Sequence, residues 1–192
     1  RRMPFGISVT VTSKNVDIII GETKDSQKIV NENGQTFLEY WAQRGIKLIW
    51  FFMYIPVGLE PDVSLMLSPE DRRRFRLWVS QNRGRDGIVM FSFWDDGVFT
   101  GGCITGEQHY HIIPRMVDGR PTVGITGCVF SPYCPDDIDL NEMTLLEASK
   151  HPYFQAVRAL KRERQNPLTP CMVVDEPEHF REAIRTGGAV PA

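Results

Sequence analysis

The segment KLIWFFMYI, residues 47–55, decides the predicted fold, because after its first lysine every residue is apolar or aromatic. A run of this length and composition is typical of a strand that is covered on both faces, as in a parallel sheet. Two similar runs flank it, FGISVTVT at residues 5–12 and IVMFSFW at residues 88–94. We therefore expect three strands, with the middle one buried on both sides.

Helix signals fill the two intervals between these strands. Thr36 and Glu39 have the spacing of a capping box, and the helix that they begin is expected to end at Gly45. Ser68 and Pro69 precede two acidic residues, which is a strong signal for a second helix start. Alternation of strands and helices predicts a parallel sheet with helical crossovers. Three strands do not close a barrel, so we expect residues 1–97 to be part of a larger α/β domain.

The composition changes near Gly97, after which glycine, proline and cysteine become frequent. Residues 98–192 are therefore predicted to form a small α+β, cysteine-rich region. Its expected elements are strands at residues 109–113 and 122–125, a turn between them at Asp118 and Gly119, a capping box at Thr144 and Glu147, and helices from Pro152 and Pro177.

The overall composition excludes several classes of protein. The chain has 192 residues, of which 42% are hydrophobic and 24% charged, so we expect a folded globular protein. Its net charge of −2 argues against a nucleic-acid partner, and the basic run at residues 72–76 is interpreted as a solvated helix face. No apolar run approaches the roughly 20 residues that span a membrane, and the first residues do not resemble a signal peptide. The sequence therefore predicts a cytoplasmic protein, and we expect that further chain precedes Arg1.

Four cysteines, Cys103, Cys128, Cys134 and Cys171, all follow the strand–helix region. Each lies in an expected loop near glycine or proline. Their spacing alone leaves four interpretations open: buried free thiols, a disulfide pair, structural zinc or a cluster.

The residues around the cysteines resemble the C-terminal region of radical S-adenosylmethionine enzymes. The resemblance rests on GCITG at residues 102–106, HIIP at 111–114, the Asp118–Gly119 turn and CVF at 128–130. It continues downstream in Tyr133, Ile138, SKHPYF at residues 149–154, NPL at 166–168 and Pro170 with Cys171, and upstream in residues 5–12, 54–58 and 93–97. It covers almost the whole chain.

This resemblance implies an incomplete parallel (β/α) barrel segment followed by a SPASM/twitch-like extension with an auxiliary 4Fe–4S cluster. The implied cluster ligands are Cys103, Cys128 and Cys171, with Cys134 as the fourth. Zinc is the alternative metal, because four thiolates also suit its tetrahedral geometry.

The resemblance also implies residues that contact a cofactor or line its pocket. Ser8 and Thr10 lie on the first strand, Tyr54 and Asp95 lie at the ends of the next two, and His111 lies at the family's histidine position. Each has an alternative interpretation: local hydrogen bonds for the hydroxyls, a solvated turn or helix cap for Asp95, and a bond to a backbone carbonyl for His111. No catalytic residue is identified.

The motif that defines the radical family, Cys-x-x-x-Cys-x-x-Cys, does not occur in this sequence. In the family this motif holds the 4Fe–4S cluster that binds S-adenosylmethionine. We therefore expect the chain to be the C-terminal portion of a longer enzyme. That enzyme is expected to use S-adenosylmethionine and its 4Fe–4S cluster to abstract hydrogen from a peptide or a small molecule. The missing N-terminal half of the barrel is its expected partner, and the chain alone is not expected to be active. The alternative is a stand-alone cysteine-rich structural or binding module that holds zinc.

Overall fold

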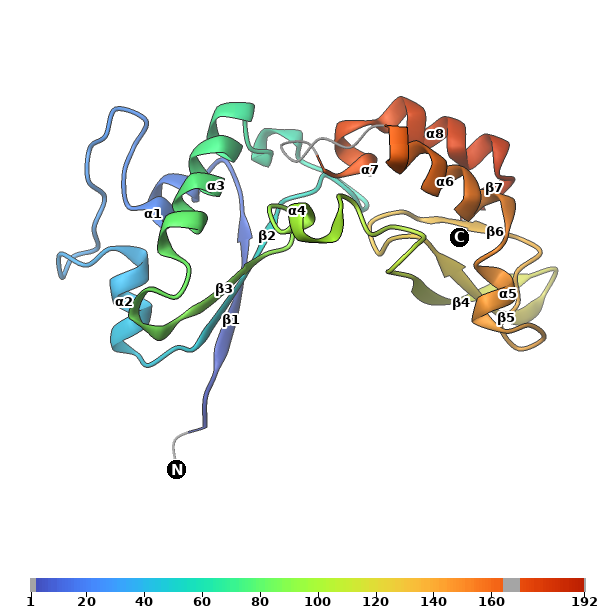
Figure 1. Cartoon of the computed structure of the whole chain (residues 1–192), viewed down its shortest axis with the longest axis horizontal. Coiled ribbons are helices and arrows are strands. Elements are labelled where there is room, and N and C mark those ends of the chain that lie inside the picture. Colours follow the sequence, from blue (N-terminus) through green and yellow to red (C-terminus); the bar gives the residue numbers. More distant parts are fainter. Residues whose placement is uncertain (1–2, 164–169, 192) are drawn as a thin grey trace. The chain divides into compact units, whose positions relative to one another are not determined.

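The computed structural model of the chain describes residues 3–163 and 170–191. The chain divides into two compact units, Arg1–Asp96 and Gly97–Ala192 (Figure 1). The NPL segment at residues 166–168, which contributes to the family resemblance, lies outside the described residues. Within the described part, no helix has the length and apolar character needed to cross a membrane.

The first unit is built on a three-stranded parallel sheet in the order β1–β2–β3. Its strands are β1 (Gly6–Val11), β2 (Leu48–Met53) and β3 (Val89–Ser92). Ser8 of β1 lies beside Trp50 of β2, which lies beside Phe91 of β3. The predicted parallel pairing is confirmed.

Three helices lie on one side of this sheet (Figure 1). They are α1 (Val16–Ile20), α2 (Phe37–Gln43) and α3 (Pro69–Asn82), and two short 3-10 turns, η1 (Val63–Leu65) and η2 (Arg85–Gly87), complete the unit. Phe51 of β2 is fully buried and packs edge-on against Phe75 of α3, with ring centroids 5.2 Å apart. The predicted capping box at Thr36 and Glu39 and the predicted cap at Ser68 are confirmed.

The opposite side of the sheet is exposed. Trp50 is 44% exposed, although it lies at the centre of the apolar segment. Trp50, Phe52 and Phe93 form a stacked row, with successive ring centroids 5.0 and 5.6 Å apart. The expectation that residues 47–55 are covered on both faces is therefore wrong for this structure, because the aromatic rings on this side cover only one another. We call this side of the sheet, which carries Ser8, Thr10, Trp50, Phe52 and Phe91, the open face.

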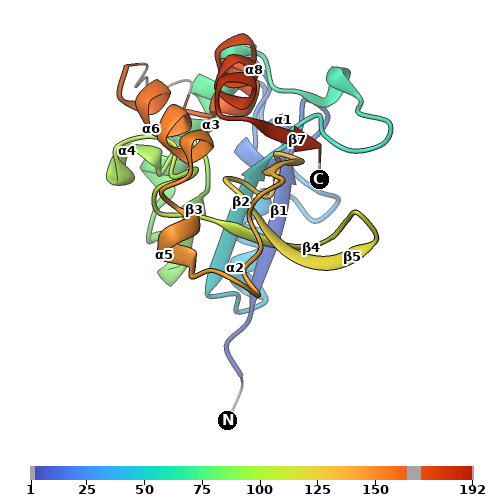
Figure 2. The same ribbon diagram turned by 90° about the vertical axis from the view of Figure 1, so that its right-hand side faces the viewer.

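The second unit combines a hairpin, a short second sheet and helices. Its elements are α4 (Gly97–Thr100), β4 (His111–Val117), β5 (Arg120–Thr126), β6 (Tyr133–Pro135), α5 (Leu145–Ala148), α6 (Pro152–Glu163), α7 (Met172–Asp175), α8 (Pro177–Thr186) and β7 (Ala189–Pro191). Figure 2 shows the antiparallel β4–β5 hairpin in yellow. Its predicted turn is confirmed, since Asp118 and Gly119 both have positive φ angles, as a two-residue hairpin loop requires. His109 lies before β4 and not on it, so the expected strand start at residue 109 is wrong.

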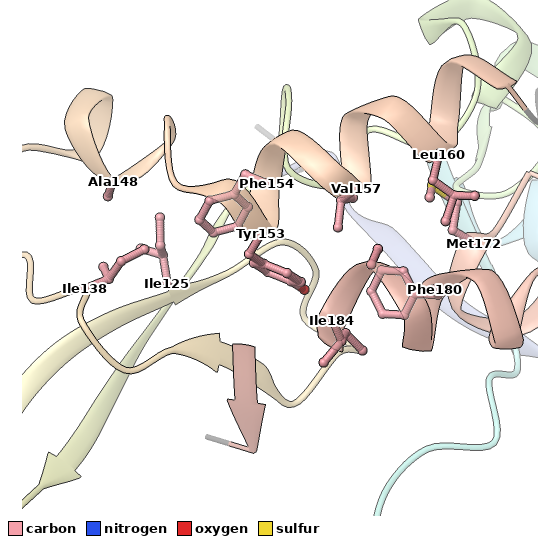
Figure 3. Close-up of a cluster of buried hydrophobic side chains, with 11 residues drawn as sticks. Ile125, Ile138, Ala148, Tyr153, Phe154, Val157, Leu160, Met172, Phe180 and Ile184 are labelled. Carbon is pink, nitrogen blue, oxygen red and sulfur yellow. The ribbon is translucent and has the colours of Figure 1, made fainter. Parts of the chain in front are cut away.

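The core of the second unit lies between α6, α8 and β5. Figure 3 shows Tyr153 and Val157 of α6 facing Phe180 and Ile184 of α8, with Ile125 of β5 nearby. These five side chains are buried, and they pack α6 and α8 together beside β5.

Candidate functional site

The first cysteine of the candidate site, Cys103, follows α4 and two glycines with left-handed backbone angles. Gly101 and Gly102 have φ angles of 72° and 102°, a region in which other residues are strained. Their turn places the Cys103 thiol against the side chain of Thr105, and Cys103 Sγ donates a hydrogen bond to Thr105 Oγ1 at 3.1 Å.

Helix α6 holds the turn that follows Thr105. The carbonyl of Gly106 accepts hydrogen bonds from Tyr110 Oη and from Arg158 Nη1, each at 2.7 Å. The second guanidinium nitrogen of Arg158 donates to the carbonyl of Ser149 at 2.9 Å. Arg158 of α6 therefore joins the turn beside Cys103 to Ser149, the C-cap residue of α5.

The second cysteine, Cys128, lies just after β5 and is 8% exposed. The backbone N–H of Phe130 donates to Cys128 Sγ at 3.4 Å. The carbonyl of Cys128 accepts from Thr126 Oγ1 and from the N–H of Ser131, each at 3.0 Å. The loop after β5 is thus folded around this thiol.

The third cysteine, Cys171, is the N-cap residue of α7. Its N–H donates to Asp175 Oδ2 at 3.1 Å, and the N–H of Asp175 donates back to the Cys171 carbonyl at 2.7 Å. The N–H of Val174 hydrogen-bonds the thiol, which favours its ionised form.

Two of these thiols, Cys128 and Cys171, have raised pKa values, and neighbouring thiols from other loops contribute to these shifts. Burial is the largest cause of the raised pKa values of Cys128 and Cys171. The charge of an ionised Cys103 raises both pKa values further, and that of Cys128 raises the pKa of Cys171. Among the described groups that most affect these two pKa values, there is no basic side chain. If all three thiols ionise, a bound cation is the natural compensation for their charge.

Cys134 has a different set of neighbours. It is fully buried in β6, and Arg115 Nη1 donates a hydrogen bond to its Sγ at 3.1 Å. Arg115 also donates to the carbonyl of Pro135 at 2.7 Å and forms an ion pair with Asp136. The Cys134 sulfur therefore already has a cationic partner within the protein.

The surroundings of the three thiols have some features of a thiolate-bound cluster site and lack another. The backbone N–H groups of Phe130 and Val174 are directed at the sulfurs of Cys128 and Cys171, as is usual where a protein tunes an iron–sulfur centre. The hydroxyls of Ser131 and Tyr153 are buried and have no hydrogen-bond partner of good geometry. Cys128 is one of the groups that raise the pKa of Tyr153. Burial is the main cause that raises the pKa of Tyr153 to about 12. Among residues 3–163 and 170–191, however, no three His, Cys, Asp or Glu side chains are grouped closely enough to form a ready-made metal site.

The predicted pocket residues of the first unit differ in how exposed their side chains are. Ser8 and Thr10 are exposed on the open face, in register with Trp50 and Phe52. The hydroxyl of Tyr54 accepts a hydrogen bond from the N–H of Asp62 at 3.1 Å, so Tyr54 anchors the loop after β2.

Asp95 lies in the turn that follows β3, as expected, whereas His111 is the first residue of β4 and not, as expected, within a strand that starts at residue 109. Asp95 is 8% exposed and accepts a hydrogen bond from Ser92 Oγ at 2.6 Å, so the alternative of a solvated turn is wrong. Burial raises the pKa of its carboxyl group. His111 is half-buried at the start of β4 and is paired with Thr126, which bonds the Cys128 carbonyl.

Three polar residues near the thiols were missed from the sequence: Thr105, Ser131 and Tyr153. Thr105 and Ser131 lie two and three residues after a cysteine, and this proximity is the only signal that the sequence contains. No family model matches the chain, and neither a curated protein nor a solved structure matches it significantly.

Proposed function

We propose that this chain is the C-terminal portion of a radical S-adenosylmethionine enzyme and that its second unit binds an auxiliary 4Fe–4S cluster through Cys103, Cys128 and Cys171. The observation that supports the proposal is that three separate loops of the second unit carry these thiols, with Cys128 8% exposed and its Sγ accepting the N–H of Phe130 at 3.4 Å. Cys134, the expected fourth ligand, is outside the proposed set because its sulfur is hydrogen-bonded to Arg115.

The chain's own residues have defined tasks in this proposal. Cys103, Cys128 and Cys171 would hold the iron as thiolates, and each would lose its thiol proton on binding. The N–H groups of Phe130 and Val174 stabilise the negative sulfurs. When bound, the cluster supplies an iron site for substrate or carries a single electron.

The first unit supplies later strands of a partial barrel and one wall of the substrate pocket. The open face offers the hydroxyls of Ser8 and Thr10 beside the rings of Trp50 and Phe52, a surface suited to a peptide or small molecule with an apolar part. Tyr54 and Asp95 keep their proposed pocket roles in the first unit, and His111 keeps its proposed role within the second unit. S-adenosylmethionine and the second 4Fe–4S cluster belong to the N-terminal half of the parent enzyme, which we place in the cytoplasm.

Anaerobic reconstitution of the full chain with ferrous iron and sulfide tests the proposal. We expect broad visible absorbance from the cluster in the wild type and its loss in Cys103→Ser, Cys128→Ser and Cys171→Ser. Cys134→Ser is the matched control, because it removes a buried thiol of the same unit and is expected to keep the cluster. Equal absorbance in all four variants would contradict the ligand assignment. Stoichiometric zinc without iron uptake would support the alternative, a cysteine-rich zinc module.

A further inference from the structure

We propose that a cavity among α1, α2 and α3 binds a small organic carboxylate, with its apolar body against Trp78 and its charged end at Arg85. All residues that line this cavity belong to the first unit, so the site does not depend on the proposed cluster. The three helices lie on one side of the sheet, opposite the open face (Figure 1). The cavity is therefore also separate from the proposed substrate wall.

The size of the cavity restricts what it can hold. Its volume is about 260 Å³. Pockets for drug-sized ligands have volumes of roughly 300–1,000 Å³, so a smaller molecule is expected here.

The apolar part of the lining comes from all three helices. Four side chains form it: Ile19, Ile20, Leu38 and Trp78. Ile19 and Leu38 are each only 3% exposed, so they belong to the packed interior of the unit. The Trp78 ring is stacked on Phe75, with ring centroids 6.1 Å apart. The cavity therefore has a preformed apolar wall with an aromatic ring in a fixed orientation.

A buried amide holds the guanidinium of Arg85 at this cavity. Asn82 is 8% exposed, and its Nδ2 donates a hydrogen bond to the carbonyl of Trp78 at 2.8 Å. Its Oδ1 accepts from Arg85 Nη1 at 3.0 Å. Arg85 Nε lies 3.7 Å from Asp86 Oδ2, while Nη2 makes no hydrogen bond to a described residue. Arg85 is therefore positioned with donors left for the oxygens of a carboxylate.

The charged side chains of the lining favour a ligand with one negative charge. Lys28 and Arg85 are positive and Glu39 is negative, which leaves a net charge of +1. The Glu39 carboxylate is already engaged, because its Oε2 accepts from the N–H and the hydroxyl of Thr36 at 2.8 and 2.9 Å. Lys28 forms no ion pair with a described residue. A singly charged carboxylate would balance the charge of the site, with its apolar body on the wall beside Trp78.

The experiment is a nuclear magnetic resonance titration of the full chain with phenylacetate. We follow the indole N–H resonance of Trp78, assigned with the variant Trp78→Phe, and expect a saturable shift. Phenylacetamide, which is neutral, and acetate, which has no ring, are each expected to bind about tenfold more weakly. Arg85→Met is expected to weaken phenylacetate binding about tenfold, and Lys28→Met about threefold.

Two further variants separate an electrostatic role from a structural one. Glu39→Gln keeps an acceptor for the capping box but removes the negative charge, so we expect phenylacetate to bind about threefold more tightly. Lys14→Met is the matched control, because it removes one positive charge from the same unit outside the cavity lining, and it is expected to leave binding unchanged. The inference is refuted if phenylacetate gives no saturable shift or binds no better than phenylacetamide. It is also refuted if Lys14→Met weakens binding as much as Arg85→Met.

Discussion

The link between Arg158 and the turn beside Cys103 gives a prediction that can be worked out from contacts. Arg158→Met keeps an unbranched apolar stem and removes the two donors that bond the carbonyls of Gly106 and Ser149. A hydrogen bond with one charged partner contributes about 1.5–3 kcal/mol. The Gly106 carbonyl keeps its bond from Tyr110, so the loss falls below the sum of two such bonds. We expect the second unit to lose about 2 kcal/mol of unfolding free energy.

Urea denaturation of the two units can be followed separately. All four tryptophans, Trp41, Trp50, Trp78 and Trp94, belong to the first unit, so tryptophan fluorescence reports on that unit alone. Amide hydrogen exchange in peptides from residues 97–163 reports on the second. We expect Arg158→Met to increase exchange there and to leave the fluorescence transition unchanged.

Arg181→Met is the control for this prediction. Arg181 is 62% exposed on α8 and pairs only with Glu178 among the described ion pairs, so its removal is expected to change stability by less than about 0.5 kcal/mol. Equal effects of the two substitutions would refute the reasoning that Arg158 fixes the Cys103 turn.

Two further predictions concern stability in each unit. Gly187→Ala would place a Cβ atom 2.3 Å from Tyr153 Cα, so we expect a loss of about 3 kcal/mol in urea denaturation, against about 1 kcal/mol for Gly188→Ala, which has free space and only backbone strain. For Asp71, burial raises the pKa, but bonds from Ser68, Lys24 and Arg74 outweigh it and lower the pKa overall. Its stabilising effect is therefore present above the unfolded-state pKa of about 3.9 and is lost as the pH falls through the lower folded-state value. We expect Asp71→Asn to cost about 2 kcal/mol at neutral pH and progressively less below about pH 4, and a cost independent of pH would contradict this explanation.

Local features of the fold could be predicted from the sequence because neighbouring residues determine them. The capping boxes at Thr36 and Thr144 each need only a glutamate three residues later, and both form as predicted. The Asp118–Gly119 turn likewise follows from the few residues that tolerate positive φ angles.

Non-local features could not be predicted in the same way. The β6–β7 pair joins Cys134 to Val190 across 56 residues, and each strand is only three residues long. Such short strands carry too little periodicity to be recognised. The open face shows a related limit, because an apolar segment such as residues 47–55 does not reveal whether its second face is covered.

The candidate site could be predicted from the sequence only in part, for the same reason. The sequence identifies four cysteines but does not divide them into groups. In the structure, Cys134 has Arg115 as its partner, whereas the pKa values of Cys128 and Cys171 are raised in part by other thiols. Thr105 was missed because a threonine near a cysteine is common, and only the folded chain shows that its hydroxyl accepts a hydrogen bond from Cys103 Sγ.

The central claim is that three thiolates of this chain bind an iron–sulfur cluster, and the iron and sulfide content after anaerobic reconstitution tests it most directly. We expect about four irons and four sulfides per wild-type chain, and background levels when Cys103, Cys128 and Cys171 are all replaced by serine. One zinc per chain with no iron uptake, or iron binding that survives the triple substitution, would contradict the claim.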